Sequence, residues 1–240
     1  APGLGWQDLR TIGTCLELAA EGIRVAPNLS ATKAHHLWDQ VDPDRSRDLC
    51  IGTVDSWIAW TLSEGALHVT DPTNAALTGL RTGDCTDWSD EVLDRLRLPR
   101  RALPTVVDSE GAVGAATALE GAPLIAGIAG DQQASLLGQG CIAIGQAKAT
   151  FGTGGMLDVC VGPTRPTFAT RGHGGTFPMV CWRQDGVPTW GVEAVMLSAG
   201  TNVEWLRDDL GLIPDAASSS DIAASVPDAD GVVYVPALLG

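Results

Sequence analysis

Apolar positions recur at helical spacing near the start of the chain. Residues 7–22 place four of them on one side of a helix, and Gly22 permits the left-handed turn that often ends one. Periodicity of this kind predicts an amphipathic helix that buries its apolar side. The four positions are Leu9, Ile12, Leu16 and Ala19.

Residues that cap helices predict where the next ones begin. Ser30 is expected to cap a helix that stops before Pro43, and Ser89 a helix that closes before Pro99. Thr53 is expected to cap a further helix between them. The apolar side chains of that helix, which we expect to face a core, are Trp57, Ile58 and Trp60.

A turn separates a short strand from another helix in the same region. His68 precedes the turn on an alternating strand pattern, where we expect a backbone or side-chain partner for its ring. Asp71 opens the turn and caps the short helix expected over residues 75–80.

The stretch from Gly121 to Gly155 carries most of the candidate chemistry. Residues 123–130 form an apolar run with the length of a buried strand, and the run ends on Asp131. A short helix is predicted next, with Leu136 on its apolar side. A carboxylate at the end of a strand is well placed to accept a proton from a substrate hydroxyl. The sequence leaves equally open that Asp131 only caps the helix after it.

Residues 148–159 predict a strand, a glycine-rich turn and a second strand. Gly152 and Gly154 leave the backbone accessible, and Thr150 and Thr153 place hydroxyls beside it. Backbone N–H groups next to a threonine hydroxyl suit phosphate oxygens, without the lysine of a Walker-type loop. An ordinary hairpin turn explains the same residues equally well.

The last third of the chain predicts a buried strand over residues 189–197 and a helix over 203–211. Gly200 precedes that helix. A glycine there either lets a flat ligand lie against the backbone or lets helices pack closely, and both interpretations stay open. A short helix from Ser220 and a β-like run over residues 231–236 follow. His173 is expected to be an isolated loop histidine.

Small residues dominate residues 106–121, which we expect to be the most weakly packed part of the chain. We place a domain boundary and a hinge there. The expected domains are residues 1–113 and 114–240.

Composition narrows the class of protein. The 240 residues include 29 glycines and 45% hydrophobic residues, which is typical of a close-packed α/β protein of one large or two small domains. Acidic residues outnumber basic ones by 29 to 15, and the net charge of −14 makes nucleic acids and anionic membranes poor partners. An anionic nucleotide would bind through backbone N–H groups, a few cations and a metal ion.

The six cysteines are scattered, without CxxC pairs or zinc-like spacing, and predict reduced thiols in a cytoplasmic protein. No basic-then-apolar leader opens the sequence, and no apolar run is long enough to span a bilayer. His35 and His36 lie about 100° apart on a helix and therefore do not bind one metal ion together. We expect no metal held by the protein's side chains alone.

Seven runs of residues carry a resemblance to a known family. They are residues 6–11, 52–57, 68–75, 128–133, 151–154, 204–208 and 233–237. In this order they resemble the FGGY carbohydrate kinases over essentially the whole chain, most closely the members that phosphorylate glycerol. The combination of the Gly-Asp-Gln-Gln run with the Phe-Gly-Thr-Gly turn is more specific than either run alone.

The resemblance implies an α/β, actin-like ATPase (ribonuclease-H-like) fold in two partial domains. It also implies ATP-dependent phosphorylation of a polyol such as glycerol, with Mg²⁺ neutralising phosphate charge. Asp131 becomes the base that deprotonates the acceptor hydroxyl, and Gln132 a hydrogen-bonding partner of the polyol.

The nucleotide-binding residues also follow from the resemblance. Thr153, between Gly152 and Gly154, is expected to contact the phosphates, while Gly200 and Glu204 flank the base and ribose. Phosphoryl transfer needs positioning and charge neutralisation more than covalent help from protein groups.

Several positions depart from the family pattern. Asn28 stands where the family has an aromatic residue that packs on the polyol, and His36 where it has tryptophan. Because an amide at position 28 can bond an extra hydroxyl, a longer polyol or a sugar such as a pentulose is an alternative substrate. Glu204 replaces a glutamine. Residues 114–122 replace the regulator-binding stretch of some relatives, so we expect no such regulation.

The family's first phosphate loop and its Arg-Glu substrate pair would precede Trp6. We therefore expect the chain to correspond to a middle segment of the family, inactive by itself. A non-catalytic actin-like nucleotide-binding module is the rival from another class, and a homo-oligomer is compatible with either function.

Overall fold

A computed structural model describes residues 2–82, 85, 87–167 and 175–236, and the chain divides into two compact units. Unit 1 comprises Ala1–Ala134 with Met179–Trp190, and unit 2 comprises Ser135–Pro178 with Gly191–Gly240. Helix α6 and strands β7 and β8 each have residues in both units. The domain boundary between residues 113 and 114 stays a prediction, and His173 lies outside the described residues.

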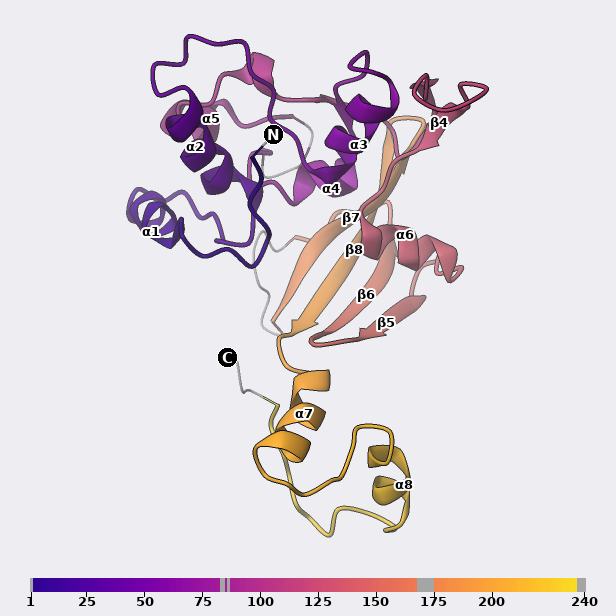
Figure 1. The fold of residues 1–240 in the computed structure, drawn as a ribbon. Helices are drawn as coiled ribbons and strands as arrows, with labels where there is room; N and C mark the ends of the chain where they lie inside the picture. The colour runs from indigo at the N-terminus through magenta and orange to yellow at the C-terminus, as the bar shows by residue number, and fades with distance from the viewer. Residues whose placement is uncertain (1, 83–84, 86, 168–174, 237–240) are drawn as a thin grey trace. The chain divides into compact units, whose positions relative to one another are not determined.

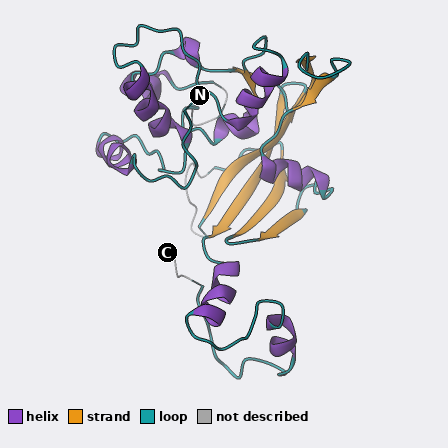
Figure 2. Ribbon diagram, in the orientation of Figure 1, coloured by secondary structure: helices purple, strands orange, loops and turns teal. Residues whose placement is uncertain are grey.

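Unit 1 is mostly helical in its described part (Figure 2). Its helices are α1 (Ile12–Ala20), α2 (Ser30–Val41), α3 (Val54–Leu62), α4 (Pro72–Ala76), α5 (Asp90–Arg95) and the start of α6 (Asp131–Gly138), with a 3-10 turn at Arg100–Ala102. Short strands β1 (Val69–Thr70) and β2 (Thr105–Val106) pair in parallel. Strands β3 (Glu110–Ala115) and β4 (Leu124–Gly127) pair antiparallel.

One apolar core joins α1, α2, α4, α5 and the 3-10 turn of unit 1, while α3 packs through Ala59 in a separate small cluster. Leu18, Leu80, Leu93 and Leu96 are almost fully buried in it, and the Trp38 ring packs among them. Burying a leucine side chain contributes about 1.5–3 kcal/mol. This cluster therefore supplies much of the driving force that orders unit 1.

The predicted burial of α1 and α3 was wrong. In α1 the residues Ile12 and Leu16 are exposed, because Cys15 and Leu18 form the buried face and the helix begins five residues later than predicted. In α3 the side chains of Trp57 and Ile58 are 56% and 50% exposed, and Trp60 is 37% exposed. The small residues Ser56 and Ala59 provide the buried face of α3 instead.

Helix starts follow the predicted caps in part. The side chains of Asp71 and Ser89 accept the N–H groups of Asn74 and Val92, which confirms both caps. Ser30 is the first residue of α2 rather than its cap. Thr53 precedes α3, but its hydroxyl donates to the carboxylate of Asp55 instead of accepting a helix N–H.

Strand β4 confirms the predicted strand before Asp131, but its predicted burial was wrong. Leu124 is 65% exposed, because β4 pairs only with β3 in the described part of the chain. Leu124 therefore lies on an open surface, while Val113 of β3 and Ile125 of β4 pack against a small apolar cluster.

A four-stranded sheet has the strand order β5-β6-β8-β7, with β5, β6 and parts of β7 and β8 in unit 2 (Figure 1). The strands are β5 (Ala147–Phe151), β6 (Gly155–Gly162), β7 (Thr176–Gln184) and β8 (Val187–Met196). Antiparallel pairing of β5 with β6 confirms the predicted strand, turn and strand over residues 148–159. Helices α7 (Gly200–Asp208) and α8 (Ser219–Ala224) follow β8.

The β-like run predicted over residues 231–236 is not a strand. Tyr234 instead stacks on Trp205 of α7, with ring centroids 5.9 Å apart, and its hydroxyl donates to Asn202 at 2.7 Å. An aromatic contact with a helix thus takes the place of sheet pairing. None of the helices in the described ranges combines the length and apolarity needed to cross a bilayer.

Candidate functional site

The predicted base lies where β4 gives way to α6. Asp131 is the first residue of α6, and its side chain is exposed. One of its oxygens, Oδ1, accepts the N–H of Gln132 at 2.8 Å. The carboxylate is therefore not buried as a structural cap, and it remains accessible to a ligand. Gln132 follows it in the first turn of the same helix.

The loop before α2 carries the candidate specificity residue. Asn28 is exposed there, one residue after Pro27. The ammonium group of Lys33 is buried and donates to the carbonyls of Pro27 at 2.6 Å and Trp6 at 3.2 Å. Burial lowers the pKa of Lys33. Lys33 thus anchors the backbone from which the Asn28 side chain extends.

The glycine-rich turn and the start of α7 lie directly against each other in unit 2. The N–H of Gly200 donates to the carbonyl of Gly152 at 2.8 Å, and the N–H of Ala199 to the carbonyl of Thr153 at 2.8 Å. A helix N-terminus carries partial positive charge, which favours phosphate, although turn carbonyls already accept the first N–H groups of this helix. Turn and helix end together have the chemistry of a phosphate-binding corner.

Close approach explains the glycines of this corner. A Cβ atom on Gly200 would lie 2.7 Å from the carbonyl oxygen of Gly152, and one on Gly154 would lie 2.9 Å from that of Met196. Space beside Gly152 is open, since the nearest atom to a Cβ there is 3.9 Å away. Close packing therefore accounts for Gly200 and Gly154, while a glycine at position 152 is required by neither of these contacts and has open space beside its Cα.

Glu204 is exposed on α7, one turn after Gly200 and therefore on the same face of the helix. The structure thus brings together the turn residues and Gly200 within unit 2, and Asp131 with Gln132 in unit 1. Asp131 and Thr153 belong to different units.

Replacing Gly200 with alanine tests the corner. The added Cβ would displace the turn, so we expect the dissociation constant for Mg·ATP, used as a phosphate-bearing probe in calorimetry, to rise by about tenfold or more. Gly13→Ala in α1 is the matched control, because nothing lies within 4 Å of a Cβ there. Equal dissociation constants for Mg·ATP in both variants would contradict the assignment.

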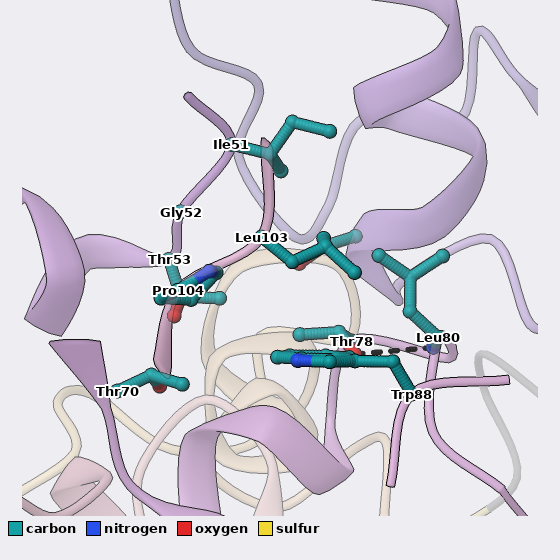
Figure 3. A pocket seen from close by; sticks show the side chains of 10 residues that line it. Ile51, Gly52, Thr53, Thr70, Thr78, Leu80, Trp88, Leu103 and Pro104 are labelled. Atoms are coloured by element: carbon teal, nitrogen blue, oxygen red, sulfur yellow. Dashed lines mark hydrogen bonds between the residues drawn. The ribbon is translucent and has the colours of Figure 1, made fainter. Parts of the chain in front are cut away.

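A small pocket in unit 1 is a poor candidate for the substrate site. Figure 3 shows Leu80, Trp88 and Leu103 around it, with Thr70 and Thr78 at its lower edge. Its volume is about 20 Å³, room for about one water molecule. A three-carbon polyol is several times larger, so we interpret the pocket as a packing defect of the core.

Two features near the candidate site were not predicted. The first is a fully buried ion pair across β5 and β6, in which Lys148 Nζ lies 2.6 Å from Asp158 Oδ2. The sequence did contain a signal for this pair. In the register of the predicted hairpin, Lys148 lies opposite Asp158. The pair holds the two strands that present the Thr153 turn.

The second is a hydrogen-bond network around Asp71, whose side chain is 0% exposed. Asp71 Oδ1 accepts the hydroxyl of Thr73 at 2.8 Å, and Oδ2 accepts the hydroxyl of Ser109 at 2.6 Å. Sequence reasoning identified only the local helix cap. Ser109 lies 38 residues away from Asp71, a separation for which no local pattern provides a signal.

Ser109 links this network to the turn between β7 and β8. Its hydroxyl accepts the N–H of Arg183 at 3.0 Å, and the guanidinium of Arg183 pairs with Asp108. The N–H of Gly186 and that guanidinium lower the pKa of Asp108. The turn between the two strands is therefore tied to residues 108–109.

Comparisons with known proteins agree on the fold and the family. Residues 2–138 match the N-terminal domain of the FGGY family of carbohydrate kinases. The chain is 43% identical to a glycerol kinase of Aromatoleum aromaticum and 38% identical to one of Thermus brockianus. Each match covers 100% of the chain, but only 51% and 50% of the respective relative. The chain thus spans about half the length of these curated relatives.

Solved structures show the same architecture. A Plasmodium falciparum glycerol kinase solved with ADP superposes with a TM-score of 0.82 at 24% identity, over 97% of this chain and 51% of that one. A xylulose kinase from Rhodospirillum rubrum gives 0.78 at 22% identity, over 96% and 49%. These similarities confirm the expected actin-like fold. With the match over residues 2–138, they lead to one conclusion: the chain belongs to the FGGY family of carbohydrate kinases.

Proposed function

We propose that the protein transfers the terminal phosphoryl group of ATP to a hydroxyl of glycerol, forming glycerol 3-phosphate. The observation that carries this proposal is the exposed carboxylate of Asp131 at the end of β4, in a chain whose relatives are glycerol kinases. A carboxylate placed there can accept the proton of the attacking hydroxyl. Gln132, one residue further on, is proposed to hydrogen-bond the polyol.

The nucleotide is proposed to bind at the corner formed by the turn and α7. Backbone groups of Gly152, Thr153 and Gly154 would hold the phosphates, while Gly200 and Glu204 would flank the base and ribose. The N-terminal end of α7 adds favourable partial charge next to the turn. Positioning of this kind accounts for most of the catalysis expected in phosphoryl transfer.

Mg²⁺ supplies charge neutralisation on the phosphates when it is bound. Within the described ranges, no group of three or more histidine, cysteine or acidic side chains converges as a metal cage. Mg²⁺ usually keeps several waters and binds through substrate phosphates and one or two carboxylates. The donor set fits that mode, in which the nucleotide phosphates and waters would hold the ion and Asp131 would stay free to act as the base.

The proposed partner is the small polyol rather than a macromolecule. A net charge of −14 opposes binding to nucleic acid or to an anionic membrane. We also propose a cytoplasmic location, where the thiols of Cys15, Cys50, Cys141 and Cys160 would stay reduced.

A substrate panel with the full-length protein tests the function. We expect ATP consumption with Mg²⁺ and glycerol, and a product that is phosphorylated on a terminal hydroxyl. Tight ATP binding without turnover on any polyol or sugar would contradict the proposal and favour a nucleotide-binding module.

The second candidate function is phosphorylation of a sugar such as a pentulose. Asn28 favours it, because its exposed amide offers hydrogen bonds where an aromatic ring would cover the carbon face of glycerol. Higher kcat/KM for a pentulose than for glycerol in the same panel would support this alternative.

Asn28→Tyr separates these two candidates further. We expect the ratio of kcat/KM for glycerol to that for a pentulose to rise by about tenfold, because a ring gains apolar contact and loses the amide hydrogen bonds. Asn28→Ala serves as the control that removes the amide without adding a ring. An unchanged ratio in both variants would show that residue 28 does not select the substrate.

A further inference from the structure

We propose that the buried carboxylate of Asp71 is a positioning residue for the loop that carries Asp131, acting through the hydroxyl of Thr73. This inference rests on the proposed function, because it concerns how the base is held. All the contacts that carry it lie within unit 1.

A short relay of hydrogen bonds connects the two aspartates. The hydroxyl of Thr73 lies 2.8 Å from Asp71 Oδ1, and the backbone N–H of Gly130 donates to the same hydroxyl at 2.8 Å. Gly130 is the residue immediately before Asp131. The relay therefore ends on the peptide group adjoining the proposed base.

The chemistry of the donors gives the relay one direction. A backbone N–H only donates, so the Thr73 oxygen must accept from Gly130. The single hydroxyl hydrogen of Thr73 is then left for Asp71, and an ionised carboxylate only accepts. Ser109 repeats the arrangement on the other oxygen, since it donates to Asp71 Oδ2 and accepts from the N–H of Arg183.

The surroundings make the relay rigid. Asp71 is 0% exposed and Thr73 is 1% exposed, so water does not replace a lost partner easily. Asn74 adds two more donors to Asp71 Oδ1, from its backbone N–H at 3.1 Å and its side-chain amide at 2.9 Å. Asn74 thus fixes the Asp71 carboxylate, and the carboxylate in turn fixes the Thr73 hydroxyl.

Gln133 packs beside the same glycine. Its side chain is buried, and a Cβ atom on Gly130 would lie 2.5 Å from its Oε1. The side chains of Gln133 and Thr73 therefore leave no room for a side chain at position 130, and they pack against the backbone immediately before Asp131.

Variants of Thr73 in the full-length protein test the inference. Thr73→Val keeps the shape of the side chain but leaves the N–H of Gly130 without an acceptor. We expect kcat to fall by about 10–100-fold while the KM for ATP stays within about threefold, since a misplaced base affects the chemical step. Thr73→Ser keeps the hydroxyl, and we expect it to restore kcat to within about threefold of the parent.

Ser109→Ala is the matched control, because it removes the other arm of the same carboxylate. We expect it to lose hydrogen-exchange protection at Arg183 and to keep kcat within about threefold of the parent. Thr73→Val should lose protection at Gly130 instead. Hydrogen exchange therefore tests the relay even if the protein shows no enzymatic activity.

The outcomes separate the two proposals. If the parent protein phosphorylated no polyol, the proposed function would be overturned. Hydrogen exchange at the N–H of Gly130 in Thr73→Val would still test the relay, because lost protection supports it and unchanged protection contradicts it. An active parent with unchanged kcat in Thr73→Val, or an equal loss of kcat in Ser109→Ala, would overturn the inference alone.

Discussion

Replacing Asp131 with asparagine is expected to lower kcat of the full-length protein by about 10²–10⁴-fold, the range typical of a lost general base. The amide cannot accept the proton of the attacking hydroxyl, while its oxygen can still accept the N–H of Gln132. The KM for ATP should therefore stay within about threefold of the parent. Steady-state kinetics with varied ATP and varied polyol measure both quantities.

Thermal stability distinguishes this role from helix capping. Because the Asp131 side chain is exposed and its one described contact survives in asparagine, we expect the melting temperature to stay close to that of the parent. Asp94→Asn, at an exposed position of α5, is the matched control for loss of one surface charge. An unchanged turnover in Asp131→Asn would remove the assigned role. A fall in stability that parallels the fall in activity would indicate a structural cap.

The largest effect on stability is expected from Lys148→Met. The side chains of Lys148 and Asp158 are both fully buried and 2.6 Å apart, and Asp158 Oδ1 has no hydrogen-bond partner among the described residues. Removal of the lysine leaves a buried carboxylate without its counter-charge, which typically costs about 3–5 kcal/mol. We expect lost hydrogen-exchange protection in β5 and β6, together with a higher KM for ATP, because these strands present the Thr153 turn.

A double variant and an exposed pair provide the controls for Lys148. Lys148→Met combined with Asp158→Leu removes both charges, and we expect it to recover most of the lost stability, as buried ion pairs replaced by apolar residues often do. Arg101→Met breaks an exposed pair with Asp48, for which the expected cost is at most about 1 kcal/mol. If the single Lys148 variant matched the Arg101 variant, the buried pair would have no special role in the hairpin.

Much of the local structure could be predicted from the sequence. The caps at Asp71 and Ser89 and the hairpin over residues 148–159 depend on neighbours within a few residues, and all three predictions were confirmed. The partner expected for His68 is also present, since its Nε2 lies 2.9 Å from the carbonyl oxygen of Ile51. Patterns of this range reflect backbone hydrogen bonds that form within one turn or one hairpin.

Burial was predicted less well. Trp57 and Ile58 were expected in a core, but small residues form the buried face of α3. Leu124 was expected inside a sheet, but β4 has one neighbour in the described part of the chain. Hydrophobicity alone predicts that a side chain tends to be covered, and only the packing of distant segments decides which one is.

The sequence by itself determined the family, the residue types of the candidate site and the local elements that carry them. Motifs and short-range hydrogen bonds depend only on residues that are close together in the sequence. The tertiary structure alone revealed that Asp71 meets Ser109 and that Thr73 meets Gly130, 57 residues further along the chain. Such contacts form when the fold excludes water from polar groups of different segments, which then satisfy one another. The support beneath Asp131 is therefore a property of the folded chain, while Asp131 itself was recognisable from its motif.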